Sequence, residues 1–82
     1  MRLHYSARFL KSYASTPLVI QKAFDKQARY LTHNLRHPSL RAKKYDAQRD
    51  IWQARVNGEW RFYFTIEGDV YHLVEIQVNH KG

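Results

Sequence analysis

Cationic and amide side chains recur at alternate positions in the second half of the chain, a pattern typical of β-strands with one solvated face. The polar set comprises Arg41, Lys43, Gln53, Arg55, Arg61, Tyr63 and Gln77. Arginine can donate two parallel hydrogen bonds to a phosphate, and the ring of Tyr63 or Tyr71 could stack on an unpaired base. The pattern therefore indicates a nucleic-acid site. The solvent-exposed face of any antiparallel sheet could show the same alternation. The presence of four cations and no acid in the set favours the nucleic-acid site.

The histidines offer a second kind of chemistry. His80 precedes Lys81 near the end of the chain, where an imidazole could act as a general acid or base; a frayed terminus is the alternative. His33 and His37 are four residues apart, a spacing that can place two metal ligands on one helix face. No third ligand lies near them in sequence, and no P-loop, GxGxxG, GxSxG or HExxH motif is present. We therefore expect neither a metal site nor a small-molecule cofactor.

The spacing of apolar residues predicts the elements that position these side chains, beginning with a strand at residues 2–5 and two helices. Ser6 predicts the cap of a short first helix, because its hydroxyl can accept a hydrogen bond from a free backbone N–H. Thr16 and Pro17 predict the start of a second helix, with Thr16 as its cap. From Ile20 to Leu35 the apolar positions of this second helix are three or four residues apart, and residues 34–38 carry its stop signals.

After Pro38 the period changes to two, which predicts strands at residues 40–45, 51–56, 60–66 and 70–78. Asn57 and Gly58 predict a tight hairpin turn in which both residues tolerate positive φ. In the last strand, alternation predicts a core-facing set of Val70, His72, Val74, Ile76 and Val78. The resulting order, β-α-α-β-β-β-β, predicts an α+β fold. Its N-terminal strand and helical hairpin would accompany a mostly antiparallel sheet, with the helices covering one face.

Length and charge narrow the class of protein. The chain has 82 residues, which predicts a single domain over residues 1–82. Its formal net charge is +7, and residues 1–44 hold ten cations and one acid, Asp25. A basic half on a folded domain favours a polyanionic partner. The absence of cysteine excludes disulfides and thiolate chemistry. No apolar run of spanning length occurs, so we expect a cytoplasmic protein with no membrane partner.

Three stretches of the chain have the pattern of a known family. They are residues 37–44 (HPSLRAKK), residues 51–56 and 59–64 (IWQARV and EWRFYF), and residues 78–81 (VNHK). In these stretches, in length and in element order, the sequence resembles the RelE/ParE superfamily of toxins from bacterial type II toxin–antitoxin systems. The resemblance covers essentially all 82 residues.

The resemblance implies one of two activities. RelE-like members are ribosome-dependent endoribonucleases that cut mRNA in the decoding site, and ParE-like members poison DNA gyrase. A cognate antitoxin protein neutralises both kinds. An RNase of this type needs no metal, because RNA supplies its own nucleophile, the 2′-hydroxyl. We expect the ribonuclease; the gyrase poison and a non-enzymatic binding module of the same fold are the alternatives.

The resemblance also implies residue roles. Arg55 and Arg61 match basic sheet positions of the ribonuclease branch, and His80 and Lys81 match a catalytic or phosphate-binding position near the C-terminus. We therefore expect these four to be catalytic. The expected RNA-binding residues are Arg41, Lys43, Lys44, Gln53 and Tyr63. The chain departs from the pattern at Gln53, where the best-known members carry a lysine.

Overall fold

The structure, a computed structural model, describes residues 2–79 and has the predicted element order. β1 (Arg2–Tyr5) precedes two helices, α1 (Ala7–Ala14) and α2 (Leu18–His33), and a 3₁₀ turn, η1 (Pro38–Leu40). The remaining strands are β2 (Lys43–Asp46), β3 (Ile51–Arg55), β4 (Trp60–Glu67) and β5 (Val70–Val78). The predicted α+β class is therefore confirmed.

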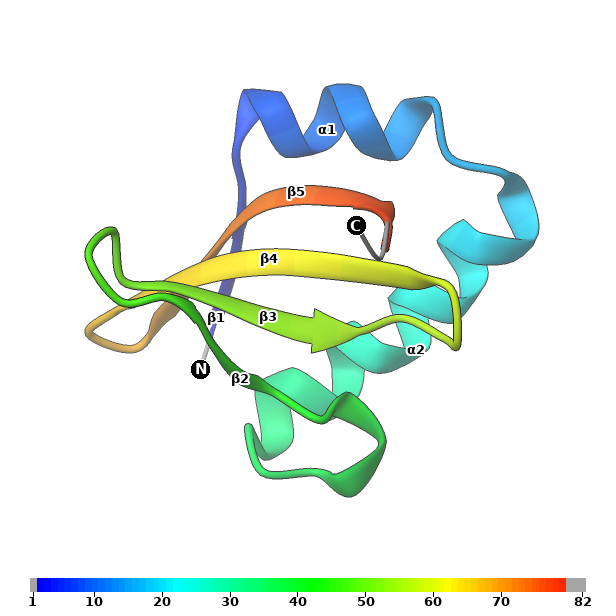
Figure 1. Cartoon of the computed structure of the whole chain (residues 1–82). Helices are drawn as coiled ribbons and strands as arrows, with labels where there is room; N and C mark the ends of the chain where they lie inside the picture. Colours follow the sequence, from blue (N-terminus) through cyan, green and yellow to red (C-terminus); the bar gives the residue numbers. More distant parts are fainter. Residues whose placement is uncertain (1, 80–82) are drawn as a thin grey trace.

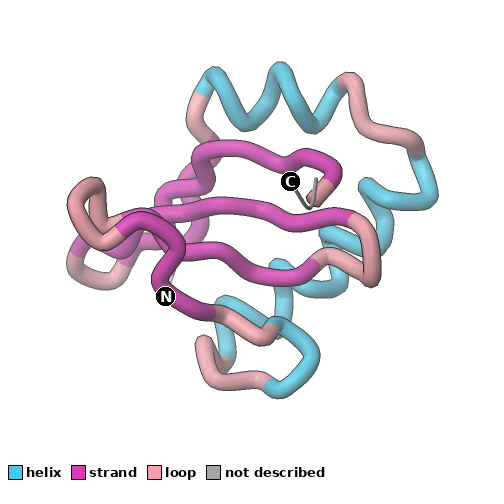
Figure 2. The backbone as a smooth tube through the Cα atoms, viewed as in Figure 1, coloured by secondary structure: helices cyan, strands magenta, loops and turns pink. Residues whose placement is uncertain are grey.

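The described strands form one sheet in the order β1-β5-β4-β3-β2. β1 pairs with β5 in parallel, and the other three pairs are antiparallel. Figures 1 and 2 show α1 running beside β5 and α2 lying behind the sheet, while the strands present their other face to the viewer. No helix in residues 2–79 is long and apolar enough to cross a membrane.

The helices cover the apolar face of the sheet. Phe9 of α1 and Phe24 and Leu31 of α2 are at most 1% exposed. The Phe24 ring packs edge-on against Phe62 of β4, with 5.0 Å between ring centroids. Phe64 of β4 belongs to the same fully buried cluster. Burying these large side chains on one face leaves the opposite face of β3 and β4 free for polar residues.

The helix starts follow the predicted signals only in part. The Ser6 hydroxyl caps α1, accepting a hydrogen bond of 3.0 Å from the Phe9 N–H. Thr16 does not cap α2, contrary to the prediction. Its hydroxyl donates instead to the Ser12 carbonyl at 2.8 Å, and the cap position belongs to Pro17. The buried Thr16 thus closes the end of α1.

The predicted strand at residues 40–45 begins later than expected. Leu40 is fully buried at the end of η1, and Arg41 adopts a left-handed conformation with φ of 46°. Strand β2 starts at Lys43. Alternation placed Arg41 and Lys43 on one strand, but burial of Leu40 and the left-handed residue set them on different elements.

The β3–β4 hairpin forms where predicted but with a different turn. Neither Asn57 nor Gly58 is among the positive-φ residues. The Asn57 side-chain oxygen instead accepts hydrogen bonds of 2.9 Å from the N–H groups of both Glu59 and Trp60. An asparagine that bonds ahead to the backbone mimics a turn, and this removes the need for the left-handed conformation.

The predicted alternation of β5 is wrong in its first half. Tyr71 and Leu73 are 3% and 0% exposed, whereas His72 lies on the polar side. The register between β4 and β5 shifts by one residue, because Tyr63 pairs with Glu75 while Phe64 pairs with Leu73. This bulge exchanges the two faces of the strand, so the predicted alternation is correct only after it, where Ile76 is buried.

Candidate nucleic-acid interface

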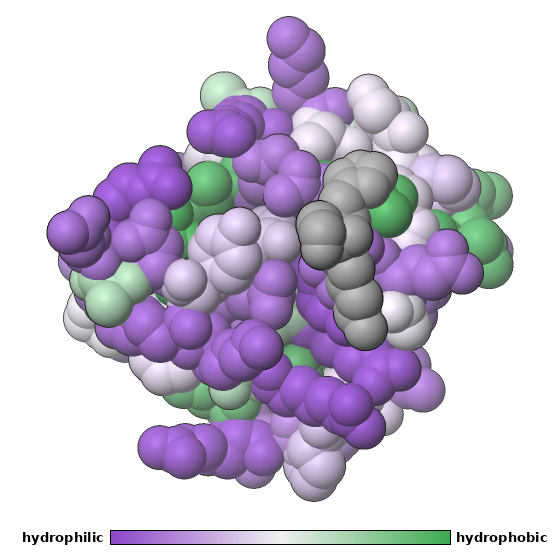
Figure 3. All heavy atoms as spheres, viewed as in Figure 1, coloured by the Kyte–Doolittle hydropathy of each residue, from purple (hydrophilic) through white to green (hydrophobic). Residues whose placement is uncertain are grey.

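A cationic cleft lies on the polar face of the sheet, across β2, β3 and β4. It has a volume of about 690 Å³. Its lining residues are Arg41, Lys43, Lys44, Tyr45, Gln53, Ala54, Arg55, Arg61 and Asn79. Figure 3 shows that most of the face around it is hydrophilic. No acid belongs to this described lining, so the cleft favours an anionic ligand.

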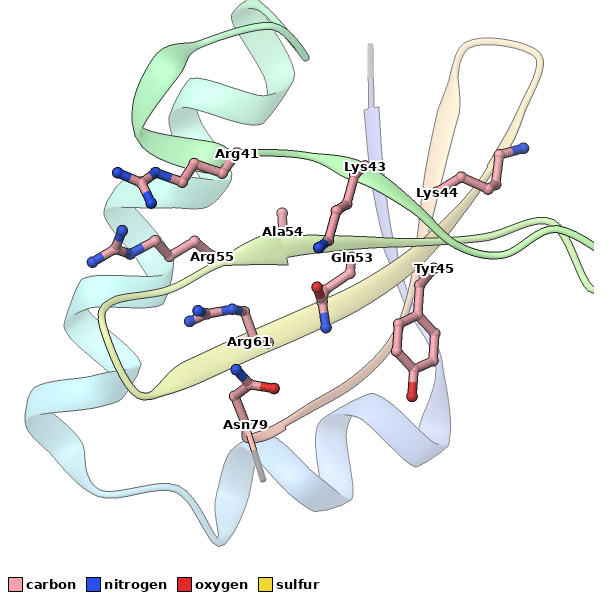
Figure 4. A pocket seen from close by; sticks show the side chains of 9 residues that line it. All are labelled: Arg41, Lys43, Lys44, Tyr45, Gln53, Ala54, Arg55, Arg61 and Asn79. Atoms are coloured by element: carbon pink, nitrogen blue, oxygen red, sulfur yellow. The ribbon is translucent and has the colours of Figure 1, made fainter. Parts of the chain in front are cut away.

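Three arginines converge on one side of this cleft. Figure 4 shows the side chains of Arg41, Arg55 and Arg61 directed the same way. Arg55 and Arg61 are directly opposite each other in the β3–β4 ladder. Like charges on opposing positions repel, and their close placement is stabilised when an anion binds between them. The structure thus brings together two residues expected to be catalytic and one expected to bind RNA.

Arg61 is fixed by the hairpin that precedes it. Its Nη1 donates to the Asn57 carbonyl at 2.7 Å and to the Trp60 carbonyl at 3.0 Å. These bonds use one nitrogen of the guanidinium and leave the others available to a ligand. Glu75 does not neutralise Arg61, because its carboxylate pairs with Arg8 at 2.6 Å and its partner across the ladder is Tyr63.

A buried amide anchors the segments that carry Arg41 and Arg55. Gln27 of α2 is 6% exposed, and its Nε2 donates to the carbonyls of Ser39 at 3.0 Å and Arg55 at 2.8 Å. Its Oε1 accepts from the Ser39 hydroxyl at 3.1 Å. The Gln27 side chain therefore links α2, η1 and the end of β3. Its hydrogen bonds fix the backbone segments from which the side chains of Arg41 and Arg55 extend.

The aromatic part of the cleft differs from the prediction. Tyr63 is only 7% exposed, its hydroxyl accepts a hydrogen bond of 3.1 Å from Gln53, and Tyr45 lies edge-on against its ring. Tyr45 is 57% exposed. A base can therefore stack on the exposed ring of Tyr45. Tyr63 is covered by Tyr45 and only packs against its ring. Tyr71 is buried in the core, so the expectation that it could stack on a base is wrong.

The side chains of Lys43 and Lys44, which are neighbours on β2, point in different directions. Lys43 pairs across the ladder with Gln53 and shares the cleft with it. Lys44 pairs with Trp52, lies over that indole ring, and forms an ion pair with Asp50. Figure 4 shows the Lys44 side chain directed away from the arginines. Lys44 thus lines the cleft, but its ammonium group pairs with Asp50 and does not join the three arginines.

Two expected catalytic residues, His80 and Lys81, lie outside the described residues. Asn79, directly before them, lines the cleft and its N–H donates to the Glu59 carbonyl at 2.7 Å. The chain thus reaches the cleft at its last described residue.

Sequence reasoning missed several residues of this site. Tyr45 is two residues after Lys43 and therefore shares a strand face with it. This alternation could have identified Tyr45 from the sequence. No sequence signal identified Gln27, because the carbonyls to which it donates are brought near it by folding. Asn57 was predicted only as a turn residue, and that prediction did not include the hydrogen bond that its carbonyl accepts from Arg61.

The chain has the same fold as several solved toxin structures, so the expected RelE-like fold is confirmed. A YoeB/ParE toxin from Agrobacterium tumefaciens has a TM-score of 0.80 at 13% identity, covering 98% of this chain and 100% of that one. A chain of the archaeal RelE–RelB complex from Pyrococcus horikoshii has a TM-score of 0.79 at 15% identity, covering 99% of this chain and 97% of that one. The intact Escherichia coli RelBE toxin–antitoxin complex contains a chain with a TM-score of 0.72 at 11% identity, covering 96% of each. No protein-family model and no curated protein sequence matches the chain.

Proposed function

We propose that this chain is the toxin of a type II toxin–antitoxin system and acts as a ribosome-dependent, metal-independent mRNA endoribonuclease. The observation that carries this proposal is the convergence of Arg41, Arg55 and Arg61 on one cleft whose described lining contains no acid. The toxins and toxin–antitoxin complexes among its structural neighbours support the toxin role through shared fold.

Cleavage of RNA in this proposal depends on aligning the reacting groups and stabilising charge on the phosphate, more than on a strong nucleophile from the protein. The 2′-oxygen attacks the adjacent phosphorus and loses its proton, the P–O5′ bond breaks, and the 5′-oxygen gains a proton. The product is a 2′,3′-cyclic phosphate and a free 5′-hydroxyl. Arg55 and Arg61 stabilise the extra charge on the phosphate oxygens, because guanidinium stays ionised throughout.

The surrounding residues position the RNA. Arg41 and Lys43 bind flanking phosphates, and Tyr45 provides a stacking surface beside Gln53. In this proposal His80 transfers protons and Lys81 contacts phosphate. Lys44 has a minor role, because Asp50 already pairs with it.

The test is cleavage of mRNA on programmed ribosomes by the purified chain. We expect cuts in the ribosome-bound mRNA, loss of cutting in Arg61→Ala, and full cutting in Arg29→Ala. Arg29 is an exposed residue of α2 outside the cleft, so its substitution makes the same change in net charge. Intact mRNA with the wild-type chain on ribosomes would refute the ribonuclease.

The gyrase alternative is separated by a second assay. Gln53 in place of the lysine of the best-known ribonucleases is the observation that favours it. Supercoiling and DNA cleavage by purified gyrase should be unaffected by the chain if the proposal is correct. Gyrase-dependent DNA breaks with intact mRNA would assign the chain to the other branch.

A further inference from the structure

Two histidines meet at the edge of the sheet opposite β2. His4 of β1 and His72 of β5 are directly paired in the parallel ladder. Their Nδ1 atoms are 3.3 Å apart, and the two rings meet edge to face with centroids 5.2 Å apart. We propose that these two nitrogens bind a zinc ion.

The separation of the nitrogens fits tetrahedral coordination. Two ligands at Zn–N distances of about 2.0–2.1 Å in a tetrahedron are about 3.3–3.4 Å apart. The observed separation of 3.3 Å is close to this value; the two nitrogens share a hydrogen bond at this distance, which a bound ion would replace. Adjacent ligands of a square-planar Cu²⁺ ion at similar bond lengths would be about 2.8 Å apart. The geometry therefore favours zinc.

The carboxylate of Glu67 lies near Nε2 of His72, the ring nitrogen that does not contact His4. The Oε1 atom of Glu67 is 3.5 Å from His72 Nε2. A carboxylate in this place favours the tautomer with its proton on Nε2, which leaves the Nδ1 lone pair free for the metal. A hydrogen bond from His72 Nε2 to Glu67 would therefore make Nδ1 of His72 the better ligand.

The site has two protein ligands and two positions for water. Among residues 2–79, no group of three His, Cys, Asp or Glu side chains is placed to hold a metal ion. Binding is thus weaker than at a closed structural zinc site. A bound ion would link β1, an edge strand of four residues, to β5 and so stabilise the start of the chain. His4 and His72 are 68 positions apart, which is why spacing in the sequence did not reveal the pair.

The test is titration of the full chain with zinc chloride by calorimetry, together with the melting temperature. We expect saturable binding of one zinc ion per chain and a higher melting temperature, both reversed by EDTA. His4→Gln and His72→Gln should each abolish this binding, and Glu67→Gln should weaken it about 10-fold. A matched double variant, His33→Gln with His37→Gln, should bind as the wild type does.

His4 is exposed, so His4→Gln should remain folded even if His72→Gln does not. Circular dichroism of each variant checks this point. The proposal is overturned if the wild-type chain does not bind zinc, if folded His4→Gln binds it as tightly as the wild type, or if His80→Gln alone abolishes binding. The outcomes with the wild-type chain and with His4→Gln do not bear on the ribonuclease proposal, since neither His4 nor His72 lines the cationic cleft.

Discussion

Arg55 and Arg61 face each other directly across the β3–β4 ladder, and the N–H groups that close their hairpin bond to the side chain of Asn57. The same Asn57 supplies the carbonyl that accepts from Arg61 Nη1. One loop residue therefore shapes the turn and orients a guanidinium that we propose to be catalytic.

Arg61→Ala should remove toxicity without unfolding the protein. Loss of a charge-assisted contact made mainly in the transition state costs about 2–4 kcal/mol, or roughly 30- to 1000-fold in rate. Arg61→Lys should recover little, because an ammonium group does not reproduce the forked geometry. Growth arrest and melting temperature are the measurements, with Arg29→Ala as control. A folded and fully toxic Arg61→Ala protein would contradict the proposed role.

Gln27→Ala should destabilise the chain, because it leaves the partly buried carbonyls of Ser39 and Arg55 without their donor. The expected loss in free energy of unfolding is about 1–3 kcal/mol. Gln48→Ala, at an exposed position in the β2–β3 turn, should change it by less than about 0.5 kcal/mol. Urea denaturation of both variants measures the difference. Equal stabilities would show that the Gln27 hydrogen bonds contribute nothing.

Tyr45→Ala should weaken binding of a short single-stranded RNA. Loss of one stacked base costs about 1–3 kcal/mol, and Tyr45→Phe should retain the stacking. The melting temperature should fall only slightly, since Tyr45 is largely exposed even though its ring covers Tyr63. Fluorescence anisotropy with labelled RNA is the measurement. Unchanged affinity in the alanine variant would exclude Tyr45 as a stacking surface.

Asp46 should titrate below the usual range. Hydrogen bonds from the Arg49 side chain and backbone lower its pKa from the ordinary 3.8. A carboxyl whose pKa is lower in the folded state stabilises the fold above its unfolded pKa of about 3.9, and this contribution disappears as pH falls through the folded value. Titration by NMR of the Asp46 carboxyl carbon checks the direction. Arg49→Ala should return the pKa toward 3.8; an unshifted value in the wild type would contradict the prediction.

The proposed antitoxin should be acidic. A chain of net charge +7 with a cationic cleft favours a partner that contributes carboxylates. The complex should have a net charge much closer to zero, and its affinity should fall as salt rises. Calorimetry with the purified partner at two salt concentrations tests this. Salt-insensitive binding to a basic partner would contradict it.

Local patterns in the sequence determined most of the elements of this protein. The 3.6-residue period identified α2, and strict alternation placed Phe62 and Phe64 in the core with Arg61 on the other face. These predictions succeeded because neighbours along one strand or helix decide which side chains share a face. The prediction for Ser6 succeeded for the same reason, because its bond reaches only three residues along the chain.

Only the tertiary structure decided the features that depend on distant segments. The bulge in β5 exchanges its faces because its register must match β4, and Leu40 becomes the end of a 3₁₀ turn because the core buries it. Tyr63 is covered because Tyr45 of another strand lies against it. Gln27 reaches Arg55 from 28 positions away, and His4 meets His72 from the far end of the chain. Such contacts arise from packing between elements, and no spacing within one element encodes them.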